Sequence, residues 1–139
     1  MTPKEYLMQI QKLNVLIDQR IAELDELRHF DGVSGIDYSK DRVQTSPQGE
    51  APFVKVIEKI MILEEQINNN IDKFVDLKNK VIGEIQGLPN PVHIQILYKK
   101  YVEFKRLEVI AVEMNYSYDY IKHQHGYALQ AFGRKYLQD

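Results

Sequence analysis

The segment from Leu107 to Leu129 constrains the fold of this chain more than any other, because its spacing fits two short helices packed across one tight turn. Ala111 supplies the small residue that the first helix needs where it touches the second. Four residues later, Asn115 is one of the few non-glycine residues that adopt positive φ at low cost. Ser117 can then cap the second helix by accepting a hydrogen bond from a free backbone N–H. The pattern predicts a helix-turn-helix whose inward faces carry Ile110, Met114, Ile121 and Ala128.

The residues after Thr2 predict a first long helix. Thr2 and Glu5 have the spacing of a capping box, and Pro3 suits the first helical position. Apolar residues then recur at steps of three and four, broken only at Arg20, until Asp31–Gly32 ends the pattern. The inward positions expected from this repeat are Tyr6, Ile10, Leu13, Ile17, Leu24 and Leu27.

A second long helix is expected to begin near Pro47 or Pro52. Glu64 and Lys78 occupy two missing steps of its apolar repeat. Two long helices with such seams fold back most simply as an antiparallel hairpin, although the seam could equally pair with a second chain. The glycine- and proline-rich segment 31–52 predicts a long connecting loop, with Ile36, Tyr38 and Val43 as anchors. The expected seam residues of the second helix are Ile57, Ile60, Ile67, Ile71, Phe74, Val81, Ile85 and Leu88.

The run Leu88-Pro89-Asn90-Pro91 predicts a junction, because Gly87 can end one helix while Asn90 caps the next and Pro91 opens it. We therefore expect two domains, a hairpin over 1–88 and a three-helix module over 89–139. The predicted fold is all-α, with a long coiled-coil-like antiparallel hairpin followed by a helix-turn-helix module. The first helix of that module is expected to present Ile94, Leu97, Tyr98, Tyr101 and Phe104 on one face.

Composition favours a globular protein without disulfides. Apolar residues make up 44% of the 139 residues and charged residues 27%, and there is no cysteine. No apolar run approaches the ~18 residues needed to cross a bilayer, so we expect a soluble, cytoplasmic protein. The net charge of −2 is low for a nucleic-acid-binding protein, but residues 91–139 hold 7 Lys and Arg against 5 Asp and Glu. Positive charge therefore accompanies the predicted helix-turn-helix.

The segment from Leu88 to Leu129 resembles region 4 of bacterial sigma factors. The shared features are a Pro-led helix ending in Tyr-Val-Glu, then Ile-Ala-x-x-Met, a turn, Ser, and Ile followed by Ala-Leu. With its two long helices and its Tyr-Ser-x-Asp-x-Val-Gln-x-Ser loop at Tyr38–Ser46, most of the chain is similar to the ArpU-like and RinA-like late transcription regulators of Gram-positive prophages. The resemblance implies DNA binding and transcription control, with late phage promoters as the implied targets.

If the second helix of the motif enters a major groove, its outward residues near the start would meet bases or phosphates. The base-facing candidates are Ser117, Tyr118, Asp119, Lys122 and His123, with Gly126 one turn further on. Alternatively, these residues form only the solvated face of a helix. The phosphate-contact candidates, for which a solvated basic face is the alternative, are Lys99, Lys100, Lys105, Arg106, Arg134 and Lys135.

The sequence gives no basis for a metal site, a cofactor or catalysis. The rings of His123 and His125 diverge by ~200° on a helix and cannot share one ion. His125 is expected to pack against the second long helix or to hydrogen-bond within the three-helix module, and His29 to serve as a C-terminal cap partner. No phosphate loop or nucleophile elbow is present, so we expect no enzyme.

Two hypotheses of function follow. The first is a transcription regulator that binds double-stranded DNA as a homodimer and contacts RNA polymerase. The second is a non-enzymatic phage assembly or adapter protein, such as a small terminase-like subunit, in which the long helices bind the partner.

Overall fold

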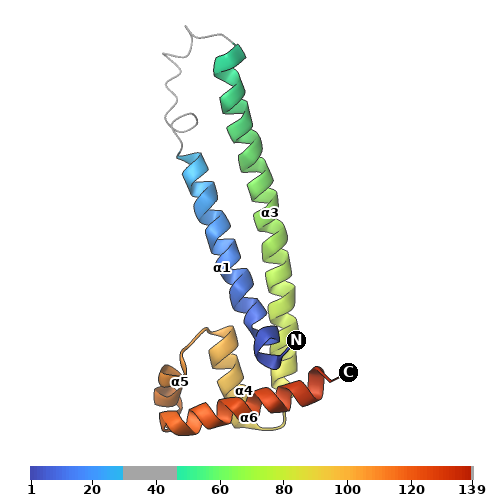
Figure 1. The fold of residues 1–139 in the computed structure, drawn as a ribbon, viewed down its shortest axis with the longest axis vertical. Helices are drawn as coiled ribbons and strands as arrows, with labels where there is room; N and C mark the ends of the chain where they lie inside the picture. Colours follow the sequence, from blue (N-terminus) through green and yellow to red (C-terminus); the bar gives the residue numbers. More distant parts are fainter. Residues whose placement is uncertain (30–46, 139) are drawn as a thin grey trace. The chain divides into compact units, whose positions relative to one another are not determined.

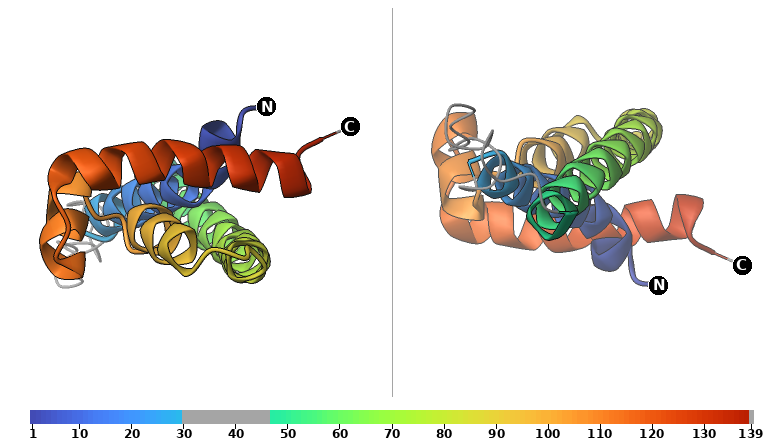
Figure 2. Two further views of the ribbon diagram at one scale, coloured as in Figure 1. Left: turned by 90° about the horizontal axis from the view of Figure 1, so that it is seen from below. Right: turned by 90° about the horizontal axis from the view of Figure 1, so that it is seen from above.

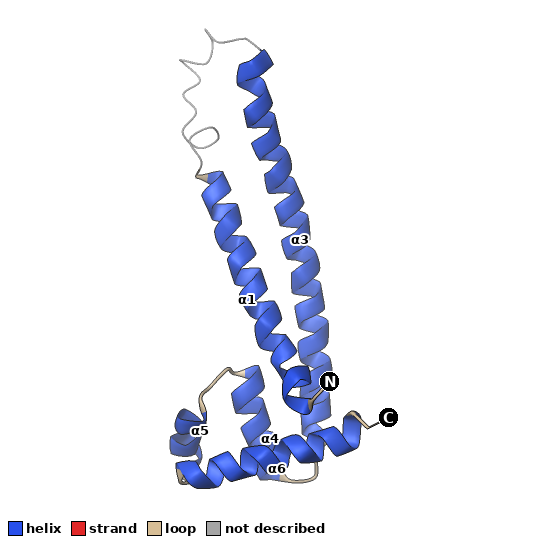
Figure 3. Ribbon diagram, viewed as in Figure 1, coloured by secondary structure: helices blue, strands red, loops and turns tan. Residues whose placement is uncertain are grey.

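The computed structural model describes the backbone of residues 1–29 and 47–138 and the side chains of residues 1–29 and 53–138. All regular structure in this described part is helical, without a strand, so the all-α prediction is confirmed (Figure 1, Figure 3). The elements are α1 (Pro3–Arg28), α3 (Pro47–Gln86), α4 (Pro91–Leu97), the π-helical turn η1 (Tyr98–Val102), α5 (Leu107–Met114) and α6 (Tyr118–Tyr136).

Two predicted helix starts are confirmed by their hydrogen bonds. At α1, Glu5 N donates to Thr2 Oγ1 at 3.1 Å and Thr2 N donates to Glu5 Oε2 at 3.3 Å, which is a reciprocal capping box. At α4, Val92 N donates to Asn90 Oδ1 at 2.9 Å. Each cap satisfies backbone N–H groups that have no partner within the helix.

α3 begins at Pro47, the earlier of the two starts expected from the sequence, so the loop predicted over 31–52 extends past the observed start of this helix. A proline fits the first position of a helix, where its missing N–H would be unpaired in any residue. The proposed anchors Ile36, Tyr38 and Val43, and the Tyr38–Ser46 motif, lie outside the described residues.

The chain packs as two compact units, and α1 and α3 contribute residues to both. We call Val15–Asp72 the helix-pair unit. Its core consists of Leu24 from α1 with three residues of α3. Arg20 Nη1 donates to Gln66 Oε1, and Arg28 forms a 3.4 Å ion pair with Glu64. A residue later in α1 therefore contacts a residue earlier in α3. The two segments are therefore antiparallel, and the α3 core residues are Ile60, Leu63 and Ile67.

We call the other unit, Met1–Asn14 with Lys73–Asp139, the multi-helix unit. Figure 2 shows α6 lying across α4 and the first turns of α1. The contact with α1 is close at Gly133, where an added Cβ would lie 2.8 Å from Pro3 Cγ. Nearby, the rings of Tyr6 and Phe132 have centroids 5.7 Å apart. The main core of this unit contains Leu7, Ile10, Val81, Ile85, Leu88, Leu97, Tyr101, Val102, Ala128 and Phe132.

The predicted seams are right in outline and wrong at particular steps. Ile71 was expected to face inward, but it is exposed. Leu63, rather than the neighbouring position 64, is buried in the helix-pair unit, and Leu7 is buried beside the predicted Tyr6. These shifts follow from the helical repeat of 3.6 residues, which drifts relative to a strict heptad.

The first helix of the predicted three-helix module is shorter than expected. Regular α-helix ends at Leu97, and the chain continues as the π-helical turn η1. Phe104 lies beyond both, with φ of 59°, so the expectation that it continues the helical face is wrong. The domain boundary expected at residue 88 stays a prediction, namely that 1–88 and 89–139 are separate domains. The observed packing places residues 1–14 and 73–88 in one unit with the C-terminal helices.

Candidate nucleic-acid interface

The turn between α5 and α6 has the geometry predicted from sequence. Asn115 is left-handed, with φ of 60° and ψ of 39°, and its N–H points to the carbonyls of Ala111 and Val112. Tyr116 N donates to Ala111 O at 3.0 Å, which closes the end of α5. Ser117 Oγ accepts from Tyr120 N at 3.1 Å and caps α6. Local hydrogen bonds therefore stabilise the turn conformation between α5 and α6.

A small second core holds α5 and α6 against α4. It consists of Ile96 from α4, Ile110 and Ala111 from α5, and Ile121 from α6, all buried. Ala111 is only 4% exposed, as expected for the small residue at the helix contact. Met114 packs against this core from the edge. This packing gives α6 an inner face, and within the described structure the opposite face at the start of the helix is exposed.

All five base-facing candidates are exposed within the described structure, at the start of α6. The hydroxyl oxygen of Ser117 already accepts the hydrogen bond that caps the helix. His123 Nδ1 donates to Asp119 O at 2.7 Å, because a carbonyl can only accept. The side chains of Tyr118 and Lys122 make no hydrogen bond to another described residue. A Cβ added at Gly126 would meet no atom of another part of the described structure within 4 Å.

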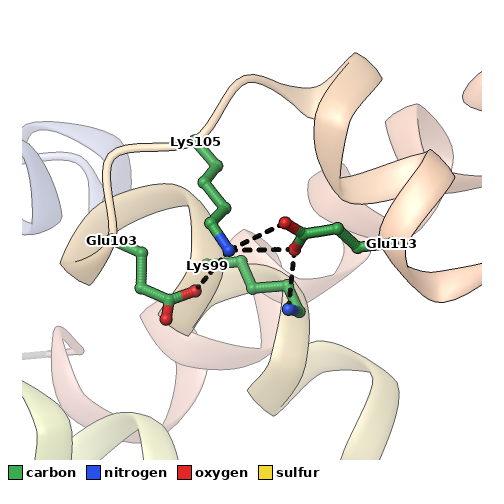
Figure 4. Close-up of polar contacts among 4 residues, drawn as sticks. All are labelled: Lys99, Glu103, Lys105 and Glu113. Atoms are coloured by element: carbon green, nitrogen blue, oxygen red, sulfur yellow. Dashed lines mark hydrogen bonds and ion pairs between the residues drawn. The ribbon is translucent and has the colours of Figure 1, made fainter.

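The phosphate candidates divide into paired and unpaired cations. Lys99 and Lys105 both bind the carboxylate of Glu113 at 2.8 Å (Figure 4). Hydrogen bonds from Lys105 and then Lys99 hold the pKa of Glu113 below its usual value, and the bond to Glu113 raises the pKa of Lys105. Lys135 donates to Gly87 O. Three candidates have no ion pair within the described residues, namely Lys100, Arg106 and Arg134.

Sequence reasoning missed several exposed aromatic and apolar side chains on α5, α6 and the turn between them. The rings of Tyr116 and Tyr120 pack with centroids 4.5 Å apart, although both side chains remain exposed. Tyr127 lies seven residues further along α6 and is 53% exposed, and Val112 on α5 is 77% exposed. Tyr116 precedes the Ser117 cap and lies outside α6, so no helical spacing relates it to Tyr120 and the sequence pattern offered no signal for this pair.

His125 takes the second of its two predicted roles, a hydrogen bond within the C-terminal helices. Its Nε2 and the Tyr101 hydroxyl share a hydrogen bond of 2.8 Å, and the two rings are stacked. Burial lowers the pKa of His125 to about 4, assisted by the positive charges of Lys100 and Lys4. Burial also raises the pKa of Tyr101 to about 12. This pair is therefore neutral at physiological pH and belongs to the packing of α6.

His29 behaves as predicted for a cap partner, since its Nδ1 donates to Asp25 O at 2.7 Å near the end of α1. Within the described residues, no three His, Asp or Glu side chains come close enough to hold one metal ion. None of the described helices combines the length and apolar character required to cross a membrane.

Comparisons of the chain with protein-family models, with curated proteins and with solved structures gave no significant match. The resemblance to sigma factor region 4 and to prophage late regulators therefore stays a prediction.

Proposed function

We propose that this protein binds double-stranded DNA through the start of α6 and regulates transcription. In this proposal α5, the Asn115 turn and α6 form a helix-turn-helix, supported by α4. One observation carries the proposal: a turn fixed by backbone hydrogen bonds precedes a helix whose outward residues are all exposed. A helix presented in this way fits the width of a major groove.

The exposed side chains offer a mixed chemistry for base recognition. Lys122 can donate to guanine acceptors or to a phosphate, and Asp119 can accept from a cytosine amine. Tyr118 offers an apolar ring edge for a thymine methyl group. Because Asp119 and Lys122 balance in charge, this helix start supplies base contacts without strong general attraction to DNA.

Weak attraction favours a dimer. Two linked modules gain affinity because binding of the first raises the effective concentration of the second. We therefore propose a homodimer, held by the long helices, that binds paired half-sites. Contact with RNA polymerase, control of late phage genes and a cytoplasmic location belong to the same proposal and derive from the sequence resemblance.

Selection of bound duplexes from a random-sequence library tests DNA binding, because the library samples every short operator sequence. The selected duplex is then titrated by fluorescence anisotropy at several salt concentrations. Lys122→Ala should weaken binding by about tenfold, the equivalent of one lost base or phosphate contact. Lys12→Ala removes the same charge from an exposed position on α1 and should have no effect. Failure to enrich any sequence, or equal affinity of the two variants, would contradict the proposal.

The adapter hypothesis has one observation in its favour. Val112, Tyr116, Tyr120 and Tyr127 expose apolar or aromatic side chains on α5, α6 and the turn between them, and such side chains suit a protein partner as well as DNA. Mass measurement in solution separates the two functions. A dimer supports the regulator, whereas a large ring supports a packaging or assembly role.

A further inference from the structure

Four charged side chains meet near the end of α5. Lys99 comes from η1, Glu103 and Lys105 from the loop after it, and Glu113 from α5 (Figure 4). Lys99 Nζ lies 2.8 Å from Glu113 Oε1, and Lys105 Nζ lies 3.0 Å from Oε1 and 2.8 Å from Oε2 of the same carboxylate. Among the described residues, Glu103 forms an ion pair with Lys105 alone, at 3.3 Å. The carboxylate of Glu113 is thus the centre on which both lysines converge.

The backbone is shaped to bring the two lysines together. Phe104 has φ of 59°, an unfavourable conformation for a bulky residue, and it is retained because the ring packs against the main core of the multi-helix unit. This conformation turns the chain back on itself, so that Lys105 N donates to Lys99 O at 3.0 Å. A strained residue held by packing makes the lysine pair a fixed feature of the fold.

The two lysine ammonium groups converge on one carboxylate, and the same arrangement of two positive charges also suits a phosphate group. A carboxylate and a phosphodiester both present two terminal oxygens, and lysine binds either one as a point charge. The site is open, since the side chains of Lys99, Lys105 and Glu113 are 26%, 31% and 33% exposed. Arg106 is exposed next to Lys105 and adds a further positive charge.

We propose that Lys99 and Lys105 form a phosphate subsite of the DNA interface, and that Glu113 occupies this subsite in the free protein. This inference rests on the proposed function. A backbone phosphate of the duplex must displace the Glu113 carboxylate to reach the lysines. Glu113 therefore weakens binding to DNA of any sequence, and a larger share of the affinity comes from base contacts by α6.

Three variants that each remove one negative charge test the inference. Glu113→Gln frees both lysines and should raise affinity for a random-sequence duplex about tenfold, with a logarithmic salt slope steeper by about one. Glu103→Gln should have a smaller effect, because Glu103 touches one lysine. Glu108→Gln is the matched control, since Glu108 is exposed on α5 outside the cluster, and its effect should stay within about twofold. Circular dichroism melts verify that each variant is folded.

Combining Glu113→Gln with Lys99→Gln and Lys105→Gln should abolish the gain in affinity. If the wild type binds DNA and Glu113→Gln matches Glu108→Gln, the phosphate subsite is wrong while DNA binding stands. If no variant binds any duplex, the proposed function itself fails.

Titration of Glu113→Gln with inorganic phosphate, followed by NMR of the lysine Nζ groups, distinguishes the source of the anion. Saturation by free phosphate without a gain in DNA affinity would overturn the inference.

Discussion

The helix-pair unit and the multi-helix unit each contain part of α1 and part of α3, yet they bury their apolar residues in different ways. In Val15–Asp72, two antiparallel segments share a single seam, and its buried core has four residues. In Met1–Asn14 with Lys73–Asp139, side chains from α1, α3, α4, η1 and α6 close around one core of ten buried residues, and a second core of four holds α5. One seam leaves each helix open to water on its other sides. Several helices around one core leave side chains such as Phe132 surrounded on all sides.

The largest expected effect separates the two cores directly. Phe132→Ala should lower the free energy of unfolding by about 3–5 kcal/mol, because the fully buried ring leaves a cavity between helices. Leu63→Ala should cost about 2 kcal/mol, because water and neighbouring side chains can fill a site on a single seam. Urea titration followed by circular dichroism measures both changes. Ile62→Ala, one residue away and 56% exposed, is the control and should change stability by less than about 0.5 kcal/mol. Equal losses at Phe132 and Leu63 would contradict the distinction between the two cores.

Acid should destabilise the multi-helix unit, because protonation of the buried His125 favours the unfolded chain. Its pKa is about 4 in the folded chain against 6.5 ordinarily, so between these values the unfolded chain binds more protons. The contribution of neutral His125 to the free energy of unfolding is therefore fully present above pH 6.5. It falls as the pH drops towards 4, by about 1–2 kcal/mol once partial exposure of the ring is allowed for. Thermal melts across this range measure the fall, and His125→Gln should remove it. Tyr101→Phe should retain the fall, because burial is the main cause of the shift. If Tyr101→Phe abolished it instead, the hydrogen bond would be the cause.

Backbone strain also distinguishes the units. The two described non-glycine residues with positive φ, Phe104 and Asn115, both lie in the multi-helix unit. Asn115→Ala should cost about 1–2 kcal/mol, because alanine has no polar side chain to offset the left-handed conformation. Asn115→Gly should be nearly neutral, because glycine adopts this conformation freely. A chemical denaturation series on both variants measures the difference, and equal stabilities would show that the turn relaxes to another conformation.

The smallest effect is expected at the surface of the helix-pair unit. Arg28 and Glu64 form an ion pair with both side chains about half exposed. Glu64→Gln should change stability by less than about 0.5 kcal/mol, because water screens the charges and the long side chains lose entropy on pairing. Thermal melts at low and high salt measure this contribution. A loss above about 1 kcal/mol would mean that the pair supports the seam more than its exposure indicates.

Local features of the fold were predictable because nearby residues determine them. Thr2 with Glu5 caps α1, and Ser117 caps α6, through bonds that span three residues. Asn115 adopts the predicted turn conformation for the same reason. The exposure of the base-facing residues followed from the position of Ile121, since one buried residue fixes the orientation of the whole helix.

Features that depend on distant residues were not predictable. Whether Leu63 or its neighbour faces inward depends on how α1 packs against α3, which a single helix pattern does not encode. The same holds for the strained Phe104, whose conformation is retained by contacts with the main core. The convergence of Lys99 and Lys105 on Glu113 depends on how η1, a loop and α5 pack together, so it could not be predicted from residue spacing in the sequence.

The shared packing of residues 1–14 with the C-terminal helices has a consequence for how the chain matures on the ribosome. Leu7 and Ile10 are synthesised well before Phe132 and Ala128, which complete the same core. Even the hydrogen bond from Tyr6 to Glu84 joins residues 78 positions apart. Residues of α3, α4 and η1 in this core emerge before α6, so the first part of α1 can be covered in steps, but its core is complete only after α6 has been translated.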